Sequence, residues 1–289
     1  MIGETATYPL EYMRNKLLSI DDLVFLMERL RDPISGCPWD VKQSFNSIVP
    51  YTLEEVYEVI DCIENCDFKH LKEELGDLLF QIIFYCNLAD EKNLFNLNDV
   101  ITCVVEKLIS RHPHVFPDGK LSSKNLNPKE QLNTEDIKKK WEEIKSNERK
   151  KKGQNSILAD IPLALPSLMR AQKIQKRAAT FGFDWKTNQE IFNKVDEEVS
   201  ELSEAISKND IENINEELGD LMFTVVNLCR HLNVDAEVAL RGSTKKFERR
   251  FNYIERKLDK DGQTLSDTKP ELLEMLWCEA KEKLARNKL

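Results

Sequence analysis

Residues 54–58, Glu-Glu-Val-Tyr-Glu, and residues 74–77, Glu-Leu-Gly-Asp, form a carboxylate pattern that occurs twice in this chain. The second copy reads Glu-Glu-Val-Ser-Glu at 197–201 and Glu-Leu-Gly-Asp at 217–220. An offset of 143 residues superposes the two copies without a gap, and 13 of 30 aligned positions are identical, seven of them acidic. Solvated charge on a helix gives no reason for such a repeat. The chain is therefore predicted to contain two copies of one domain.

Each copy is predicted to place its acids on two helices that a short polar turn connects. Glutamates 55 and 58 are three residues apart, as are residues 74 and 77, so each pair shares one helix face. Opposed residues in an antiparallel hairpin have a common midpoint, which is residue 66 in the first copy and residue 209 in the second. Both midpoints fall in a turn sequence, Asn-Cys-Asp at 65–67 and Lys-Asn-Asp at 208–210. The pairs expected to face each other are Glu55 with Asp77, Glu58 with Glu74, Glu198 with Asp220, and Glu201 with Glu217.

Four carboxylates brought together repel one another unless they are protonated or bind cations. Oxygen ligands without His or Cys suit Mg²⁺, with Mn²⁺ as the alternative. A cation held in this way binds a phosphate chain and lowers the pKa of a water nucleophile. The sequence therefore predicts a metal site in each copy, with the ligands Glu55, Glu58, Glu74 and Asp77 in the first and Glu198, Glu201, Glu217 and Asp220 in the second.

Two features near the acids have structural explanations as alternatives to a role at the metal site. Thr52 and Glu55 fit a capping box, which would give this acid a role at the start of a helix. Val195 stands at the position equivalent to Thr52 and cannot cap, although the acid is kept. Gly76 and Gly219 lie inside predicted helices, where Gly costs about 1 kcal/mol relative to Ala. Their place beside the Asp suggests close helix approach or ligand access.

A cationic pair follows each acid set on a predicted helix. The pair is Lys107 and Arg111 in the first copy and Lys246 and Arg250 in the second. A spacing of four residues puts both cations on one helix face. There they could hold phosphate oxygens and neutralise charge that develops during phosphoryl transfer. Ordinary surface charge is the alternative, and it weighs more for the first copy.

The periodicity of the whole chain predicts an all-α protein, with no alternating strand pattern of useful length. We expect two tandem domains of the four-helix-bundle type, 1–116 and 157–289, because short connections favour antiparallel bundles. A charged linker over 117–156, with a short helix around Trp141, is expected between them. The predicted helices cover 20–30, 47–65, 68–90, 97–111, 168–179, 189–207, 211–232 and 235–259, with one more near Trp277.

Composition excludes several classes of protein. The net charge of −9 argues against a nucleic-acid-binding surface over the whole molecule. Seven scattered cysteines without a CxxC pair predict neither a disulfide framework nor a zinc site, and free thiols fit a reducing compartment. No apolar run approaches the roughly 18 residues of a membrane span. We expect a cytoplasmic protein that binds neither membrane nor nucleic-acid polymer.

Motifs outside the acid hairpins carry a resemblance to a known family. They read Gly-Cys-Pro-Trp-Asp at 36–40, Arg-His-Pro-His-Val-Phe at 111–116, Gly-Phe-Asp-Trp at 182–185 and Lys-Phe-Glu-Arg-Arg-Phe at 246–251. With the acid pattern, they make the chain resemble the MazG family of nucleoside triphosphate pyrophosphohydrolases. The resemblance implies all-α homodimers in which two chains build each site, and Mg²⁺-dependent hydrolysis of NTPs and dNTPs to monophosphate and pyrophosphate. It implies the eight metal ligands named above, and a catalytic group of Glu198, Glu201, Lys246 and Arg250.

Three other readings stay open. A related helical enzyme with a narrower substrate, such as dUTP or phosphoribosyl-ATP, would share the acid pattern. A di-iron bundle would need Glu-x-x-His pairs, and no His follows a Glu at that spacing. A non-catalytic regulatory protein would leave the acids on its surface. Trp39 and Trp185 are interpreted as core anchors rather than base-stacking platforms, and no residue is identified as a contact to a base edge.

Overall fold

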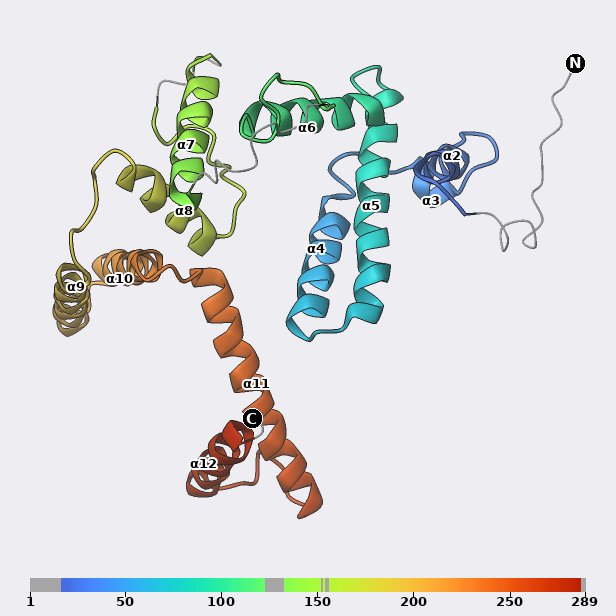
Figure 1. The fold of residues 1–289 in the computed structure, drawn as a ribbon. Helices are drawn as coiled ribbons and strands as arrows, with labels where there is room; N and C mark the ends of the chain where they lie inside the picture. Colours follow the sequence, from blue (N-terminus) through green and yellow to red (C-terminus); the bar gives the residue numbers. More distant parts are fainter. Residues whose placement is uncertain (1–16, 123–132, 152, 154–155, 287–289) are drawn as a thin grey trace, which may run out of the picture. The chain divides into compact units, whose positions relative to one another are not determined.

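The computed structural model describes residues 17–122, 133–151, 153 and 156–286 (Figure 1). The described residues form helices, turns and bends without a strand, which confirms the all-α prediction. The chain divides into two compact units, Met1–Trp141 and Glu142–Leu289. No described helix is long and apolar enough to cross a membrane. All seven cysteines lie in the described residues and are free thiols, as the absence of a CxxC pair predicts.

The first unit is built around the long helix α5, Phe68–Asp90. Helix α4, Val49–Glu64, runs antiparallel to the first half of α5 and forms the predicted hairpin with it. Helix α2, Ile20–Leu30, packs against the second half of α5, and a short helix α3, Pro38–Val41, lies between α2 and α4 in the chain. Helix α6, Leu97–Arg111, packs on α5 near its C-terminal end (Figure 1).

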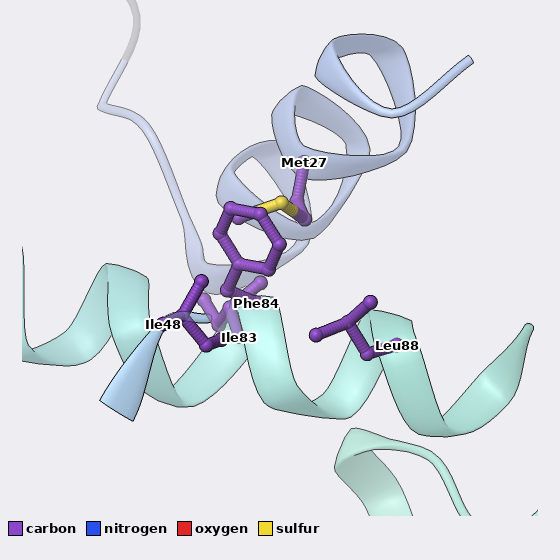
Figure 2. Close-up of a cluster of buried hydrophobic side chains, with 5 residues drawn as sticks. All are labelled: Met27, Ile48, Ile83, Phe84 and Leu88. Carbon is purple, nitrogen blue, oxygen red and sulfur yellow. The ribbon is translucent and has the colours of Figure 1, made fainter. Parts of the chain in front are cut away.

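The core of the first unit lies where α2 meets α5. Its five central side chains are at most 2% exposed. Burial of such side chains stabilises the fold by about 1.5–3 kcal/mol each. They come from α2, from the turn before α4 and from α5, so the core fastens the hairpin to the helix that precedes it. Figure 2 shows them: Met27, Ile48, Ile83, Phe84 and Leu88.

The second unit repeats the hairpin with α9, Asn188–Lys208, and α10, Ile211–His231. Helix α8, Ser167–Ala179, packs on α10 and on the start of α11, Ala236–Lys260. The last helix, α12, Pro270–Arg286, packs back on the C-terminal half of α11. The predicted bounds of the helices in both units lie within two residues of the observed bounds.

The turns of the two hairpins lie at the predicted midpoints. Cys66 and Asn209 both adopt a left-handed backbone, with φ of 56° and 52°. Such a residue ends one helix and redirects the chain, and Asn tolerates this conformation better than most side chains do. Asp67 and Asp210 follow them, and their side chains accept hydrogen bonds from the first turn of the next helix. The predicted positions of both hairpin turns are thereby confirmed.

The segment expected to be a linker is more helical than predicted. Instead of a short helix around Trp141, the 18-residue helix α7 covers Thr134–Lys151. Lys and Glu dominate this stretch and are strong helix formers, so the charge that suggests a linker is equally compatible with a helix. Part of the expected linker, 123–132, 152 and 154–155, lies outside the described residues.

Candidate functional site

The structure brings three carboxylates of each predicted set within reach of one cation. In the first unit, each acid offers an oxygen, and these oxygens lie within 4.8 Å of one another. The second unit has an equivalent group with the same spacing limit. Each group joins two acids of the first hairpin helix to one of the second, as the hairpin register predicts. The groups are Glu55, Glu58 and Glu74, and Glu198, Glu201 and Glu217.

The fourth acid of each set lies beside these groups. Burial raises the pKa of Glu55, and Asp77 is the charged neighbour that raises it most after burial. Burial likewise raises the pKa of Glu217, followed by the charges of neighbouring acids that include Asp220. Asp77 thus lies opposite Glu55, as predicted. Metal ligation by Asp77 and Asp220 stays a prediction.

Mutual repulsion shapes the electrostatics of the first set. Burial, and then Glu58 and Asp77, raise the pKa of Glu74. Burial, and then Asp77 and Glu58, do the same for Glu55. A raised carboxyl pKa means that the folded protein disfavours the ionised form. A bound cation would relieve this repulsion.

Lys194 distinguishes the second set from the first. Its Nζ lies 2.8 Å from an oxygen of Glu197 and 2.8 Å from one of Glu198, which is only 3% exposed. Hydrogen bonds to these two acids raise the pKa of Lys194 above its usual value. Tyr51 occupies the equivalent position of the first copy, so Glu55 has no such lysine. Sequence reasoning missed Lys194, although its spacing of four residues from Glu198 signals an ion pair.

The donor sets fit a hard divalent cation. Each group consists of carboxylate oxygens alone, which suits Mg²⁺ or Mn²⁺ better than zinc. In the second set, Lys194 pairs with Glu198, so a cation bound by this carboxylate would compete with the lysine.

The predicted phosphate-binding cations have other neighbours within their own chain. The Arg250 guanidinium lies over the indole of Trp277, 5.4 Å from the ring centroid, and the Phe247 ring lies 5.2 Å from the same indole. These contacts hold α11 against α12 rather than against the acid hairpin. The first-copy pair lies on α6, which packs on the end of α5 remote from the acids. Among the described residues, no contact joins the acid groups of the same chain to three of these cations: Lys107, Lys246 and Arg250.

A cavity of about 690 Å³ adjoins the second acid set. Glu198 and Asp220 belong both to the acid set and to the cavity wall, so the two are continuous. Phe183 and Trp185, from the loop between α8 and α9, also line it and are 84% and 40% exposed. The volume lies within the range of about 300–1,000 Å³ that is usual for small-molecule sites. The arrangement offers an apolar compartment next to an acid group that could hold a cation.

Three expectations near the acids need correction. Thr52 does not cap α4, because the helix begins at Val49 and the Thr52 hydroxyl instead lies 2.9 Å from the Tyr85 hydroxyl. Trp39 and Trp185 are not core anchors, since 48% and 40% of their surfaces are exposed on segments that precede the hairpins. The two helix glycines approach no other helix within the chain, because a Cβ added there would meet no atom within 4 Å: Gly76 and Gly219.

A helical hairpin that presents acids from both arms, repeated within one chain, defines the class of this protein. The family model described as the MazG nucleotide pyrophosphohydrolase domain matches residues 43–116 and again 186–254, and each match contains one acid hairpin. The nucleoside triphosphate pyrophosphohydrolase of Escherichia coli (strain K12) is 46% identical over 264 residues, which cover 91% of this chain and 97% of that protein. This chain belongs to the MazG family.

Two further relatives extend the comparison. The nucleoside triphosphate pyrophosphohydrolase/pyrophosphatase MazG of Thermotoga maritima is 42% identical over 269 residues, or 93% of this chain and 98% of that protein. The uncharacterized protein YabN of Bacillus subtilis (strain 168) is 38% identical over 281 residues, or 96% of this chain and 55% of that protein. The similarity therefore spans both copies, and the resemblance seen in the motifs is confirmed.

Proposed function

We propose that this chain is a nucleoside triphosphate pyrophosphohydrolase that converts NTPs and dNTPs to monophosphate and pyrophosphate with Mg²⁺. The observation that carries the proposal is the acid group that adjoins a ligand-sized cavity in the second unit. Relatives that are 46% and 42% identical over nearly the whole chain carry this activity in their names. In the proposed arrangement, the triphosphate binds at the acid group and the nucleoside binds in the cavity.

The acid sets would hold the metal. When bound, Mg²⁺ supplies positive charge that orients the triphosphate and lowers the pKa of a water nucleophile. The chemistry of the donor atoms supports this ion in both units. The proposed ligands are Glu198, Glu201, Glu217 and Asp220 in the second unit and Glu55, Glu58, Glu74 and Asp77 in the first.

The chain's own groups account for the rest of the reaction. A carboxylate of Glu198 or Glu201 takes the proton of the attacking water. A bond forms between the water oxygen and the α-phosphorus, while the bond from that phosphorus to the oxygen bridging it to the β-phosphorus breaks. Pyrophosphate leaves with added negative charge, which Lys246 and Arg250 neutralise. Lys107 and Arg111 would serve the first copy in the same way.

A homodimer would bring these cations to the acids. Each unit contributes a single hairpin, and a hairpin of a second copy would close a four-helix bundle with it. Exposed apolar side chains along α9 and α10 support this association, because a soluble monomer seldom keeps such a face open. They include Val199, Leu218, Met222 and Val225.

The domain bounds and location follow as part of the same proposal. The domains are proposed to be 1–116 and 157–289, with 117–156 between them, which the two family matches support. Seven free thiols support a reducing, cytoplasmic location.

Product analysis tests the activity. Incubation of the protein with each NTP or dNTP and Mg²⁺, followed by chromatography, is expected to yield monophosphate and pyrophosphate in equal amounts. In a Glu58→Gln background, which removes the first acid set, Glu201→Gln should lower the rate by about 100-fold or more, because a charge at the reacting centre is lost. Glu204→Gln is the matched control on the same helix, since Glu204 is exposed and pairs only with Lys208. Diphosphate plus inorganic phosphate, or no turnover of any nucleotide, would refute the proposed reaction.

A further inference from the structure

The cavity of the second unit has a polar end that the hydrolytic chemistry does not use. Its walls near α8 and α10 are largely apolar and include Ile174, Ala178 and Phe223. Asn227 and Arg230 interrupt this apolar lining at the C-terminal half of α10. Burying a polar amide beside apolar walls costs free energy unless the amide finds partners. The hydrogen bonds of the Asn227 side chain therefore indicate its role in the cavity.

Arg230 sets the orientation of the Asn227 amide. The Asn227 Oδ1 accepts hydrogen bonds from Arg230 Nε at 3.1 Å and from a terminal guanidinium nitrogen at 2.6 Å. Arg230 also pairs with Asp184, at 3.0 Å for one of its contacts, and His231 lies 2.9 Å from the same carboxylate. A guanidinium only donates, so the oxygen of the amide must face Arg230.

This orientation leaves the two ends of the amide with different roles. The Oδ1 of Asn227 has two lone pairs, and the two Arg230 hydrogen bonds use both. No described residue accepts a hydrogen bond from its Nδ2, and this atom is not sealed from solvent. Asn227 therefore offers hydrogen-bond donors to a ligand in the cavity and has no acceptor to spare.

The first copy shows that the hairpin does not need an amide here. Phe84 stands at the position equivalent to Asn227, is 1% exposed and packs against Met27 of α2 (Figure 2). Arg31 lies over its ring, 5.3 Å from the centroid. An aromatic side chain thus fills this position of the fold in one copy, whereas an amide lines a cavity in the other. The hairpin can therefore form without an amide here; in the second copy the amide oxygen holds Arg230, and the amide nitrogen has no acceptor among the described residues.

We propose that this cavity binds the nucleobase and that Asn227 selects bases by donating from Nδ2 to a carbonyl oxygen on the base edge. This inference rests on the proposed hydrolysis of nucleoside triphosphates, because phosphates at Glu198 and Asp220 place the base in the adjoining cavity. An Asn side chain recognises adenine through one acceptor and one donor together. Arg230 occupies that acceptor, so the amino group of adenine finds no partner. A keto group at the same place accepts from Nδ2.

Matched substrates test the selection. ITP and ATP differ at position 6 of the purine, keto against amino, and UTP and CTP differ in the same way at position 4. In the wild-type protein kcat/KM is expected to be about tenfold higher for ITP than for ATP, and higher for UTP than for CTP. The reason is that each keto base accepts one hydrogen bond that the matching amino base cannot accept. Asn227→Asp, which keeps an oxygen for Arg230 and turns the other end into an acceptor, should reverse both ratios. Asn227→Leu should bring both ratios close to one.

Controls separate this inference from the proposed function. Asn98→Asp makes the same change of charge at an exposed position of the first unit and should leave both ratios as in the wild type. Thermal unfolding checks that the Asn227 variants fold. Calorimetric binding of the non-hydrolysable α,β-methylene analogues of ITP and ATP reports base selection without turnover.

Turnover with equal ratios in wild type and variants would refute the role of Asn227 and leave the hydrolysis intact. Selective binding of the ITP analogue without turnover would refute the hydrolysis and leave the base site.

Discussion

At the scale of single residues, the two acid sets are alike in their carboxylates and differ in their neighbours. Lys194 neutralises Glu198 in the second set, whereas Tyr51 stands at that position in the first. Asn227 lines a cavity where Phe84 fills the core of the other copy. The two copies therefore share their carboxylates and differ in the side chains and helices that surround them.

The raised pKa of Glu217 predicts how the stability of the protein without added metal depends on pH. Burial, and then the neighbouring acids, raise the pKa of Glu217 above its ordinary value of 4.5. The folded state then binds this proton more tightly than the unfolded state does, so the contribution to stability is present below pH 4.5 and is lost as pH rises through the folded pKa. Glu217→Gln should raise the Tm of the metal-free protein at pH 7.5 and flatten its dependence on pH above 4.5.

Scanning calorimetry with EDTA and then with Mg²⁺ measures both effects. The rise in Tm on addition of Mg²⁺ should be smaller for Glu217→Gln than for wild type, because a proposed ligand is lost. Glu212→Gln, an exposed position on the same helix, serves as the control and should keep the wild-type response. An unchanged response to Mg²⁺ in Glu217→Gln would argue against ligation by this residue.

At the scale of elements, the helical hairpin is the unit that carries the chemistry. Left-handed turns at Cys66 and Asn209 set the register, and the register opposes the acids. Gly76 and Gly219 leave the face beside the acids open, since a Cβ added at either position would meet no atom of the chain within 4 Å. Glycine destabilises a helix relative to alanine, and we propose that these two are kept because substrate or a second copy approaches the helix there.

Gly219→Ala separates the effect of this glycine on helix stability from its effect on activity. The substitution should stabilise the chain by about 0.5–1 kcal/mol, because Ala is the better helix former and meets no clash. It should also lower kcat/KM, because the added methyl group narrows the approach of substrate or of a second copy. Gly242→Ala, inside α11 with equal space, is the matched control and should stabilise without loss of activity. Chemical denaturation and steady-state kinetics provide the two readings; full activity in Gly219→Ala would contradict a role for close approach.

At the scale of the whole molecule, we propose that each site is built from two chains. The acids lie on α9 and α10, while Arg250 stacks on Trp277 of α12 and contacts no acid of the set. A closed C2 dimer would place the cations of one copy at the acids of the other. We propose that the apolar side chains left exposed on α9 and α10 form the face for this association.

Mixing of inactive variants tests this arrangement. With the first acid set removed by Glu58→Gln, Glu201→Gln and Arg250→Ala should each be inactive alone. If the acids and the cations of one site come from different chains, a dimer of one chain of each variant contains one intact site of two. Random pairing in an equal mixture makes half of the dimers mixed. The mixture should therefore recover about a quarter of wild-type activity. Light scattering should give twice the chain mass of 33.7 kDa. Mixed samples that are dimeric yet remain inactive would show that acids and cations of one site belong to the same chain.

The helices and the acid register could be predicted because their causes are local. Helical periodicity located α5 and α6 at their observed bounds, and the turn residues placed the hairpin midpoints at 66 and 209. The length of α7 was underestimated, since a charged composition fits both a linker and a solvated helix. Lys194 was within reach of sequence reasoning, because its partner Glu198 lies one helical turn away.

The sequence by itself determined that this protein is all-helical, that it contains the acid hairpin twice, and which acids face each other. Helix period and turn chemistry act over a few residues, so they can be read along the chain. Only the tertiary structure decided that Trp185 lines a cavity, that Arg250 lies on Trp277 and that Asn227 faces a ligand-sized space. Cavities and stacking contacts depend on which distant side chains fill a common volume, as Met27 fills the space at Phe84 in the first unit.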